Sequence, residues 1–225
     1  MLSDKTIKRN PPDAIYWRAV YWARMKLSAR KRKVLNEHII DQLGDAKFTL
    51  FSNNCLAGYF YHDAKREFTT PTINMAFDGE DYIRFLEDPK RYVYGTLSFI
   101  ETDEVSYPVA HIDDIEVRFV HYHTHEECIN AWKRRSDRIL WDHIFVIATD
   151  HDGMNRPDLL ERFDKLPYKK IMYTAARKLE YPWQVQVPQF VGKDQLKIIT
   201  NIANFRGYRY YECFDIAKWI SENSN

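Results

Sequence analysis

The chain has 225 residues, of which 45% are hydrophobic and 15% aromatic, and its formal net charge at pH 7 is +1. This composition favours a folded domain with a substantial core over a disordered chain, and the balanced charge argues against a nucleic-acid partner. No apolar run reaches the ~18 residues of a spanning helix, the first residues lack the apolar centre of a secretory signal, and three scattered cysteines fit a reducing compartment. We therefore expect a cytoplasmic protein.

The N-terminal 43 residues form a unit of their own in the sequence pattern. A lead of 12 residues ends in two prolines, and Asp13 then caps a helix predicted to run from 14 to 43, closed by Gly44. This helix carries aromatic residues early and a basic run later. Such a helix can lie on an anionic membrane face or dock to a protein, which would make the chain peripheral to the inner membrane. Packing on the main domain is the commoner use of such a stripe, and we favour it.

Residues 44–225 read as a single α/β domain in which strands alternate with helices. The predicted strands are 47–51, 72–77, 96–101, 107–113, 115–122, 143–149, 171–175 and 184–187. The predicted helices are 56–67, 79–90, 125–139 (capped by Thr124, with Glu127 at capping-box spacing), 157–166, 196–204 and 214–221. Crossover helices of this length predict a mostly parallel sheet, and an antiparallel hairpin is expected around Asp113-Asp114.

The polar tetrapeptide Ser52-Asn53-Asn54-Cys55 interrupts an apolar run directly after the first strand. Ligands of open α/β sheets sit beyond the carboxyl ends of the strands. The free amides of the following helix would attract an anion or a developing oxyanion, and their field would stabilise a Cys55 thiolate. The ordinary structural alternative is a polar turn with a small buried thiol.

Several stretches, in order, resemble a bacterial family of exopolysaccharide or capsule biosynthesis proteins whose shared domain is of unknown function. The likeness covers roughly residues 47–221, through FSNNCLAGYFYHD, TPTINMAF, YPVAHIDDIEVRFVHY, AWKRRSDRILWDHIFVIATDHDG, FDKLPYKK and YYECFDIAKWI. The resemblance implies an α/β fold and a role in surface-polysaccharide synthesis, with a sugar or polysaccharide as the substrate. It implies no settled reaction.

Two carboxylate clusters suggest further chemistry. Asp150 and Asp152 follow a buried strand, where a D-x-D pair can hold Mg²⁺ or Mn²⁺ and a sugar-nucleotide diphosphate, although an Asp-rich turn closed by Gly153 is the commoner meaning. Asp114 and Glu116 lie on one face of a predicted strand and could split their pKa values as a general acid and base. Solvated pairing with arginines is the ordinary alternative.

Basic side chains offer a candidate base and candidate phosphate ligands. His121 ends a predicted strand and is the histidine best placed to act as a base, whereas His123 and His125 are expected to be structural or solvent-facing. Arg134 and Arg135 lie on a predicted helix, where they could contact phosphate groups of a substrate. A charged helix face is the usual reason for such residues.

The hypothesis that combines these features is a transferase of capsule or exopolysaccharide synthesis that moves an acyl (acetyl) group to a sugar hydroxyl, with acyl-CoA as the candidate donor. The alternatives are a metal-dependent glycosyltransferase using Asp150 and Asp152, and a non-catalytic scaffold subunit. No metal ligands are assigned under the first hypothesis. The catalytic candidates are Ser52, Asn54, Cys55, Asp114, Glu116 and His121; the substrate-binding candidates are Asn53, Asn74, Arg134, Arg135, Asp150 and Asp152.

Overall fold

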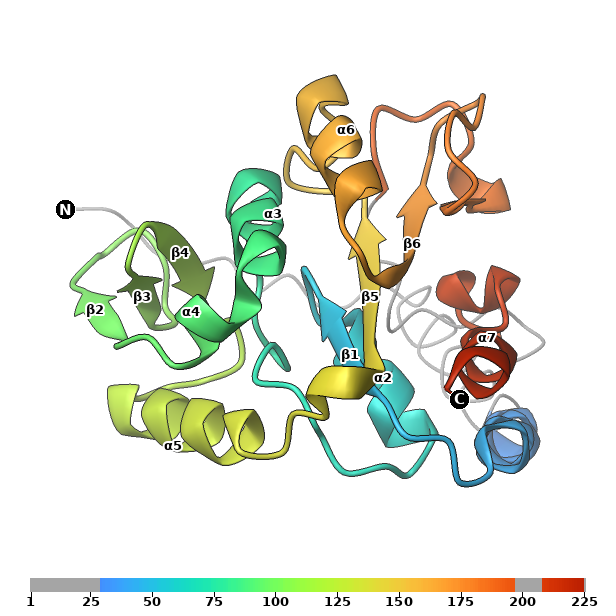
Figure 1. Ribbon diagram of the computed structural model, residues 1–225, viewed down its shortest axis with the longest axis horizontal. Helices are drawn as coiled ribbons and strands as arrows, with labels where there is room; N and C mark the ends of the chain where they lie inside the picture. The colour runs from blue at the N-terminus through green and yellow to red at the C-terminus, as the bar shows by residue number, and fades with distance from the viewer. Residues whose placement is uncertain (1–28, 197–207, 225) are drawn as a thin grey trace, which may run out of the picture.

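The computed structural model describes residues 29–196 and 208–224. Within these residues the chain forms two sheets, one of four parallel strands in the order β1-β5-β6-β7 and one of three antiparallel strands in the order β2-β3-β4. Figure 1 shows the smaller sheet beside the larger one, with α3 between them. The predicted fold class, a mostly parallel sheet with crossover helices and an antiparallel hairpin, is confirmed.

The parallel sheet consists of β1 (Thr49–Ser52), β5 (Ile144–Thr149), β6 (Lys169–Thr174) and β7 (Gln184–Gln186). All of β1, and all of β5 except its first residue, is buried, as expected of parallel strands covered on both faces. β1 and β5 are neighbours in parallel register. Their carboxyl ends therefore meet at the same edge of the sheet.

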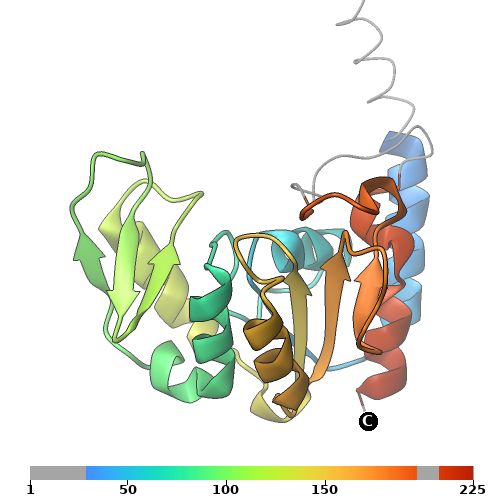
Figure 2. The ribbon, with the colours of Figure 1, turned by 90° about the horizontal axis from the view of Figure 1, so that it is seen from above.

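Helices cover both faces of the parallel sheet (Figure 2). One face packs against helical residues 29–43, α2 (Leu56–Asp63) and α7 (Ile216–Asn223). The other face packs against α3 (Gly79–Glu87) and α6 (Pro157–Lys165). The helix that follows β1 and the helix that follows β5 therefore lie on opposite faces of the sheet.

The smaller sheet and its helices form a second α/β unit beside α3. It contains β2 (Ser98–Ile100), β3 (Val109–Ile112), β4 (Ile115–Arg118), α4 (Pro89–Val93) and α5 (His125–Ser136). The remaining elements are 3-10 helices, η1 (Trp141–His143), η2 (Pro188–Phe190) and η3 (Tyr210–Cys213).

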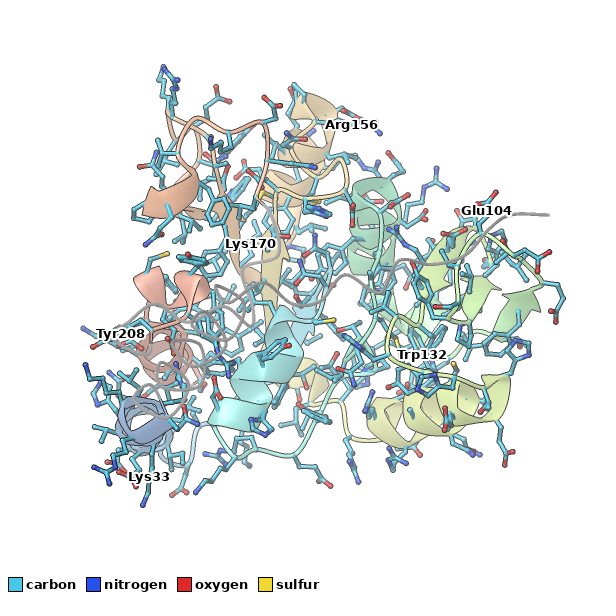
Figure 3. All side chains as sticks on the ribbon, turned by 180° about the vertical axis from the view of Figure 1, so that it is seen from behind. Lys33, Glu104, Trp132, Arg156, Lys170 and Tyr208 are labelled. Atoms are coloured by element: carbon cyan, nitrogen blue, oxygen red, sulfur yellow. The ribbon has the colours of Figure 1, made fainter. Side chains whose placement is uncertain are left out.

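Side chains of α5 hold this smaller unit together. The predicted capping box is present: Glu127 N donates to Thr124 Oγ1 at 3.2 Å, and Thr124 N donates to Glu127 Oε2 at 3.3 Å. Trp132, labelled in Figure 3, is buried and donates its indole N–H to Val93 O at 2.9 Å. An isolated antiparallel bridge between Ala76 and Arg118 links β4 to the segment that precedes α3.

The predicted helix 56–67 ends early, at Asp63, and the predicted strand 115–122 ends early, at Arg118. Three further predicted elements differ from the structure. Residues 72–77 are not a strand, because only Ala76 finds a ladder partner and Asn74 has a left-handed φ of 64°. The predicted helix 79–90 ends at Glu87, and Pro89 starts α4, with Asp88 capping it by accepting from Arg91 N at 3.3 Å. Residues 96–101 do form a strand, β2, but in the smaller sheet.

The described part of the N-terminal helix is fastened to the main body. Arg32 pairs with the buried Asp63 of α2 and with Glu212 of η3, and Leu43 is buried in the core shared with α2 and α7. The aromatic residues Tyr16, Trp17, Tyr21 and Trp22, and most of the predicted helix 196–204, lie outside the described residues. None of the helices in the described part of the chain has the length and apolar character needed to cross a bilayer.

Candidate functional site

The carboxyl ends of β1 and β5 form the topological switch point of the parallel sheet. The chain leaves β1 towards α2 on one face and leaves β5 towards α6 on the other. Ligands of open α/β sheets bind where successive loops part in this way. We call residues 52–58 and 149–153 the β1–β5 edge. Both the Ser52–Cys55 turn and the Asp150–Gly153 loop belong to it.

Asn53 and Asn54 join the two loops of the β1–β5 edge through Thr149. The buried Asn53 amide donates to Thr149 O and accepts from Thr149 N, both at 3.1 Å. Asn54 Nδ2 donates to Thr149 Oγ1 at 2.7 Å, and Asn54 Oδ1 accepts from Leu56 N at 3.0 Å. Asn53 therefore extends the ladder between β1 and β5 by one step, and its amide is committed to structure rather than to a substrate.

The first turn of α2 carries the backbone N–H groups that are predicted to bind an anion or oxyanion. The first N–H groups of a helix have no partner within it. Asn74 lies against this turn, because a Cβ placed on Gly58 would be 3.6 Å from Asn74 Oδ1. Ser52, by contrast, is buried, and its Oγ accepts from Asn54 N at 3.4 Å.

Cys55 is half-buried beside the same turn, and burial raises the pKa of its thiol to about 11. This upward shift runs against the predicted stabilisation of a thiolate at this position, because burial disfavours the charged form of the thiol. Cys55 is therefore a protonated thiol at neutral pH. This favours the structural alternative for this residue over a nucleophile.

A histidine that the sequence reasoning did not select lies in the loop after β5. His151 Nδ1 is 2.8 Å from Asp152 Oδ1, and the imidazole is 37% exposed. Asp152 has a left-handed φ of 53° and also lies 3.7 Å from Arg118 of β4, which in turn pairs with Asp78. Because Nδ1 faces this carboxylate, Nε2 is the ring nitrogen that remains for a substrate. The signal was present as a histidine between two aspartates after a buried strand.

Asp150 has a structural environment. Its Oδ2 accepts from Ala175 N at 2.7 Å and from Thr174 Oγ1 at 3.0 Å, and its Oδ1 accepts from Leu196 N at 2.7 Å. A metal ion at Asp150 would compete with these donors. Among the described residues, no group of three or more His, Cys, Asp or Glu side chains is arranged to hold a metal ion.

The structure does not bring the other carboxylate candidates to the β1–β5 edge. Asp114 lies in the β3–β4 turn, where the Tyr92 hydroxyl donates to it at 2.9 Å and lowers the pKa of its carboxyl, with help from Arg91 and Arg84. Glu116 faces His111, with Nε2 and Oε2 3.9 Å apart. The predicted pairing of these two carboxylates as acid and base is not found.

The basic candidates also have other surroundings. Arg135 is buried, donates to Ile73 O and to the Tyr122 hydroxyl, and lies over the Phe68 ring, so it supports the core. Arg134 is exposed on α5. His121 does not end a strand as predicted, because β4 ends at Arg118, and it is exposed in the turn that follows. Arg135 is therefore unsuited to the predicted contact with a substrate phosphate.

The fold and the β1–β5 edge define an α/β protein with a polar switch-point site. A family model described as a domain of unknown function, DUF1919, matches residues 26–221, and the chain belongs to this family. A relative from Haemophilus influenzae (strain ATCC 51907 / DSM 11121 / KW20 / Rd), described as "Uncharacterized protein", is 30% identical over 196 residues, which cover 87% of this chain and 94% of the relative. This chain thus matches nearly the full length of that relative.

Proposed function

We propose that this protein transfers an acyl group, acetyl in the simplest case, from an acyl-CoA thioester to a sugar hydroxyl in bacterial capsule or exopolysaccharide synthesis. The observation that carries the reaction type is the His151 imidazole held by Asp152 at the β1–β5 edge, 2.8 Å apart. The saccharide setting comes from the motif resemblance, including the SNNC and TDHDG stretches that form this edge.

The chemistry assigns one role to each side of the edge. His151 Nε2 takes the proton of the sugar hydroxyl while the oxygen forms a bond to the acyl carbon. The N–H groups of Ala57 and Gly58 in the first α2 turn, beside Asn74, receive the negative charge that develops on the carbonyl oxygen. When the C–S bond breaks, the imidazolium gives its proton to the departing thiolate. Asp152 keeps the imidazole oriented throughout.

The metal-dependent glycosyltransferase alternative fits this site less well. Both oxygens of Asp150 accept hydrogen bonds from the protein, three in total. Asp152 is shared between His151 and Arg118. A metal ion would therefore compete with partners that both carboxylates already have.

A thermal-shift screen separates the hypotheses. Acetyl-CoA at 100 times its Kd should stabilise the fold by about 2.7 kcal/mol, which corresponds to roughly 5–11 °C in Tm for a protein of this size. A response to a nucleotide-sugar that requires Mn²⁺, without a response to acetyl-CoA, would replace the proposal by the glycosyltransferase. Silence towards both ligand classes would favour the scaffold subunit.

A further inference from the structure

A pocket of about 390 Å³ lies next to the β1–β5 edge, between α6, the carboxyl end of β6 and Gln184, the first residue of β7. Asp150 belongs to both, and Asn155 and Pro157 of the pocket lining follow His151 in the same loop. Figure 3 labels Arg156 at this end of the sheet, just before α6. The pocket therefore adjoins the loop that carries His151 and Asp152, although neither of these two residues lines it.

One wall of this pocket is apolar and fixed in position. Leu160 and Met172 contribute to it, together with the Tyr181 ring, which stacks on Trp183 with the ring centroids 4.7 Å apart and the planes 15° apart. Because Trp183 is itself buried and donates to Asp164 Oδ1 at 2.7 Å, the Tyr181 ring has a rigid support. Such a wall suits the C–H face of a small ring.

The lining also offers an unused donor and an unused acceptor. Gln184 is 8% exposed, and its Oε1 accepts from Glu180 N at 2.7 Å and Tyr181 N at 3.1 Å. Asn155 Nδ2 donates to Asp194 O at 3.0 Å. In the described part of the chain, Gln184 Nε2 and Asn155 Oδ1 make no further hydrogen bond, so each can meet a hydroxyl group.

The charge of the lining selects against anions. Four carboxylates face two lysines, which leaves a net charge of −2; the residues are Asp150, Glu161, Glu180 and Asp194 against Lys178 and Lys193. Like charges repel, so the diphosphate of an acyl-CoA or a uronic acid is disfavoured here. A neutral ring, or one that carries an ammonium group, is favoured.

We infer that this pocket binds the acceptor, an uncharged or amino sugar whose C–H face lies on Tyr181 and whose hydroxyls contact Gln184 and Asn155. The inference rests on the proposed acyl transfer for its meaning, since it places the acceptor next to the loop that carries His151. The pocket volume falls within the usual range of small-molecule sites, about 300–1,000 Å³. The acyl donor would then bind on the other side of the β1–β5 edge, near the first turn of α2.

Saturation-transfer NMR on the full chain tests this inference with three probes: methyl glucoside, glucosamine and glucuronate. We expect signals from the first two and a weaker signal from glucuronate. Ala176→Trp fills the pocket, while the Ala176 carbonyl remains free to accept from Gln186 Nε2, and it should abolish the signals. Thr96→Trp is the matched control, because it places the same ring in a separate groove beside Trp132, and should leave the signals unchanged.

Glu161→Lys gives a second variant that does not depend on filling the pocket. Glu161 is exposed, and its reversal brings the lining charge from −2 to zero. The glucuronate signal should then rise relative to glucosamine. The inference is overturned if no probe gives a signal, if Ala176→Trp retains the signals, if Thr96→Trp alone loses them, or if Glu161→Lys leaves the ratio unchanged.

The acetyl-CoA thermal shift, measured on the same variants, keeps the two proposals apart. Sugar binding in the pocket without any response to acetyl-CoA would retain the pocket assignment and refute the acyl transfer. If the protein responded to acetyl-CoA and Ala176→Trp left the sugar signals unchanged, the acyl transfer would be retained and the pocket assignment refuted.

Discussion

Replacing Asn53 by alanine should destabilise the fold strongly, because this amide continues the β1–β5 ladder where β1 ends. Its two hydrogen bonds to Thr149 are 3.1 Å long, and both residues are 2% exposed. Two such bonds contribute a net ~1–3 kcal/mol, and leaving buried backbone groups unpaired adds ~1–3 kcal/mol for each group that water does not reach. We expect a loss of about 2–5 kcal/mol in the free energy of unfolding, or roughly 4–20 °C in Tm.

Urea denaturation followed by tryptophan fluorescence measures this loss as a lower midpoint at an unchanged m-value. Asn54→Ala is the matched control, because Asn54 is half-buried and contributes one hydrogen bond to Thr149 and one to Leu56 N. Its cost should be about 1–2 kcal/mol, typical of a lost helix cap. If Asn53→Ala stayed within about 0.5 kcal/mol of the wild type, the ladder role of this amide would be refuted.

Three further predictions concern the same region. Because the pKa of Cys55 is about 11, alkylation of this thiol by iodoacetamide should be slow at pH 7 and rise about tenfold per pH unit up to pH 10; peptide mass spectrometry that finds it labelled rapidly at pH 7 would contradict the burial argument. Arg162 lowers the pKa of Glu80 in the folded protein through a 2.6 Å hydrogen bond. The stability that this pair contributes should therefore be present above about pH 4.3, the pKa of an unfolded glutamate, and should be lost as the pH falls through the lower pKa of the folded state. Glu80→Gln should reduce this loss of stability at acid pH, by at most ~1 kcal/mol, in denaturation curves taken at a series of pH values. Gly79→Ala should cost ~1–3 kcal/mol, because the added Cβ would lie 2.7 Å from the Met154 backbone, and a wild-type Tm for this variant would disprove that contact.

The elements with the strongest apolar pattern were predictable from the sequence. β5 and β1 lie within about two residues of the predicted strands, because buried parallel strands read as short apolar runs. The Thr124 capping box and the Asp113-Asp114 hairpin turn were also predicted, since both depend on neighbouring residues. Residues 72–77 misled the prediction, because their apolar side chains enter the core without a strand partner beyond Ala76.

The candidate site was predictable in place but not in its details. Asn54 and Asp150 do lie at the same edge, because the ends of neighbouring parallel strands must. Whether a polar side chain is already hydrogen-bonded within the protein depends on partners far away in the sequence, and one sequence does not reveal them. Asp150 is held by residues 24 to 46 positions away, and Arg135 by Ile73, 62 positions away. The contact between His151 and Asp152 could not be predicted, because it occurs in a turn where Asp152 has a left-handed backbone conformation.

The rate of acetyl transfer by a His151→Asn variant tests the central claim most directly. Asparagine keeps a donor for Asp152 but has no basic nitrogen, and His123→Asn serves as the control because His123 is exposed in the cap before α5. Acetyl-CoA and the glycosides that bind the pocket are the substrates, and the released thiol is measured. The account predicts a loss of about 100-fold or more for His151→Asn, with an unchanged acetyl-CoA thermal shift and a near wild-type rate for His123→Asn. A His151→Asn rate within about threefold of the wild type, or no transfer by the wild type itself, would contradict it.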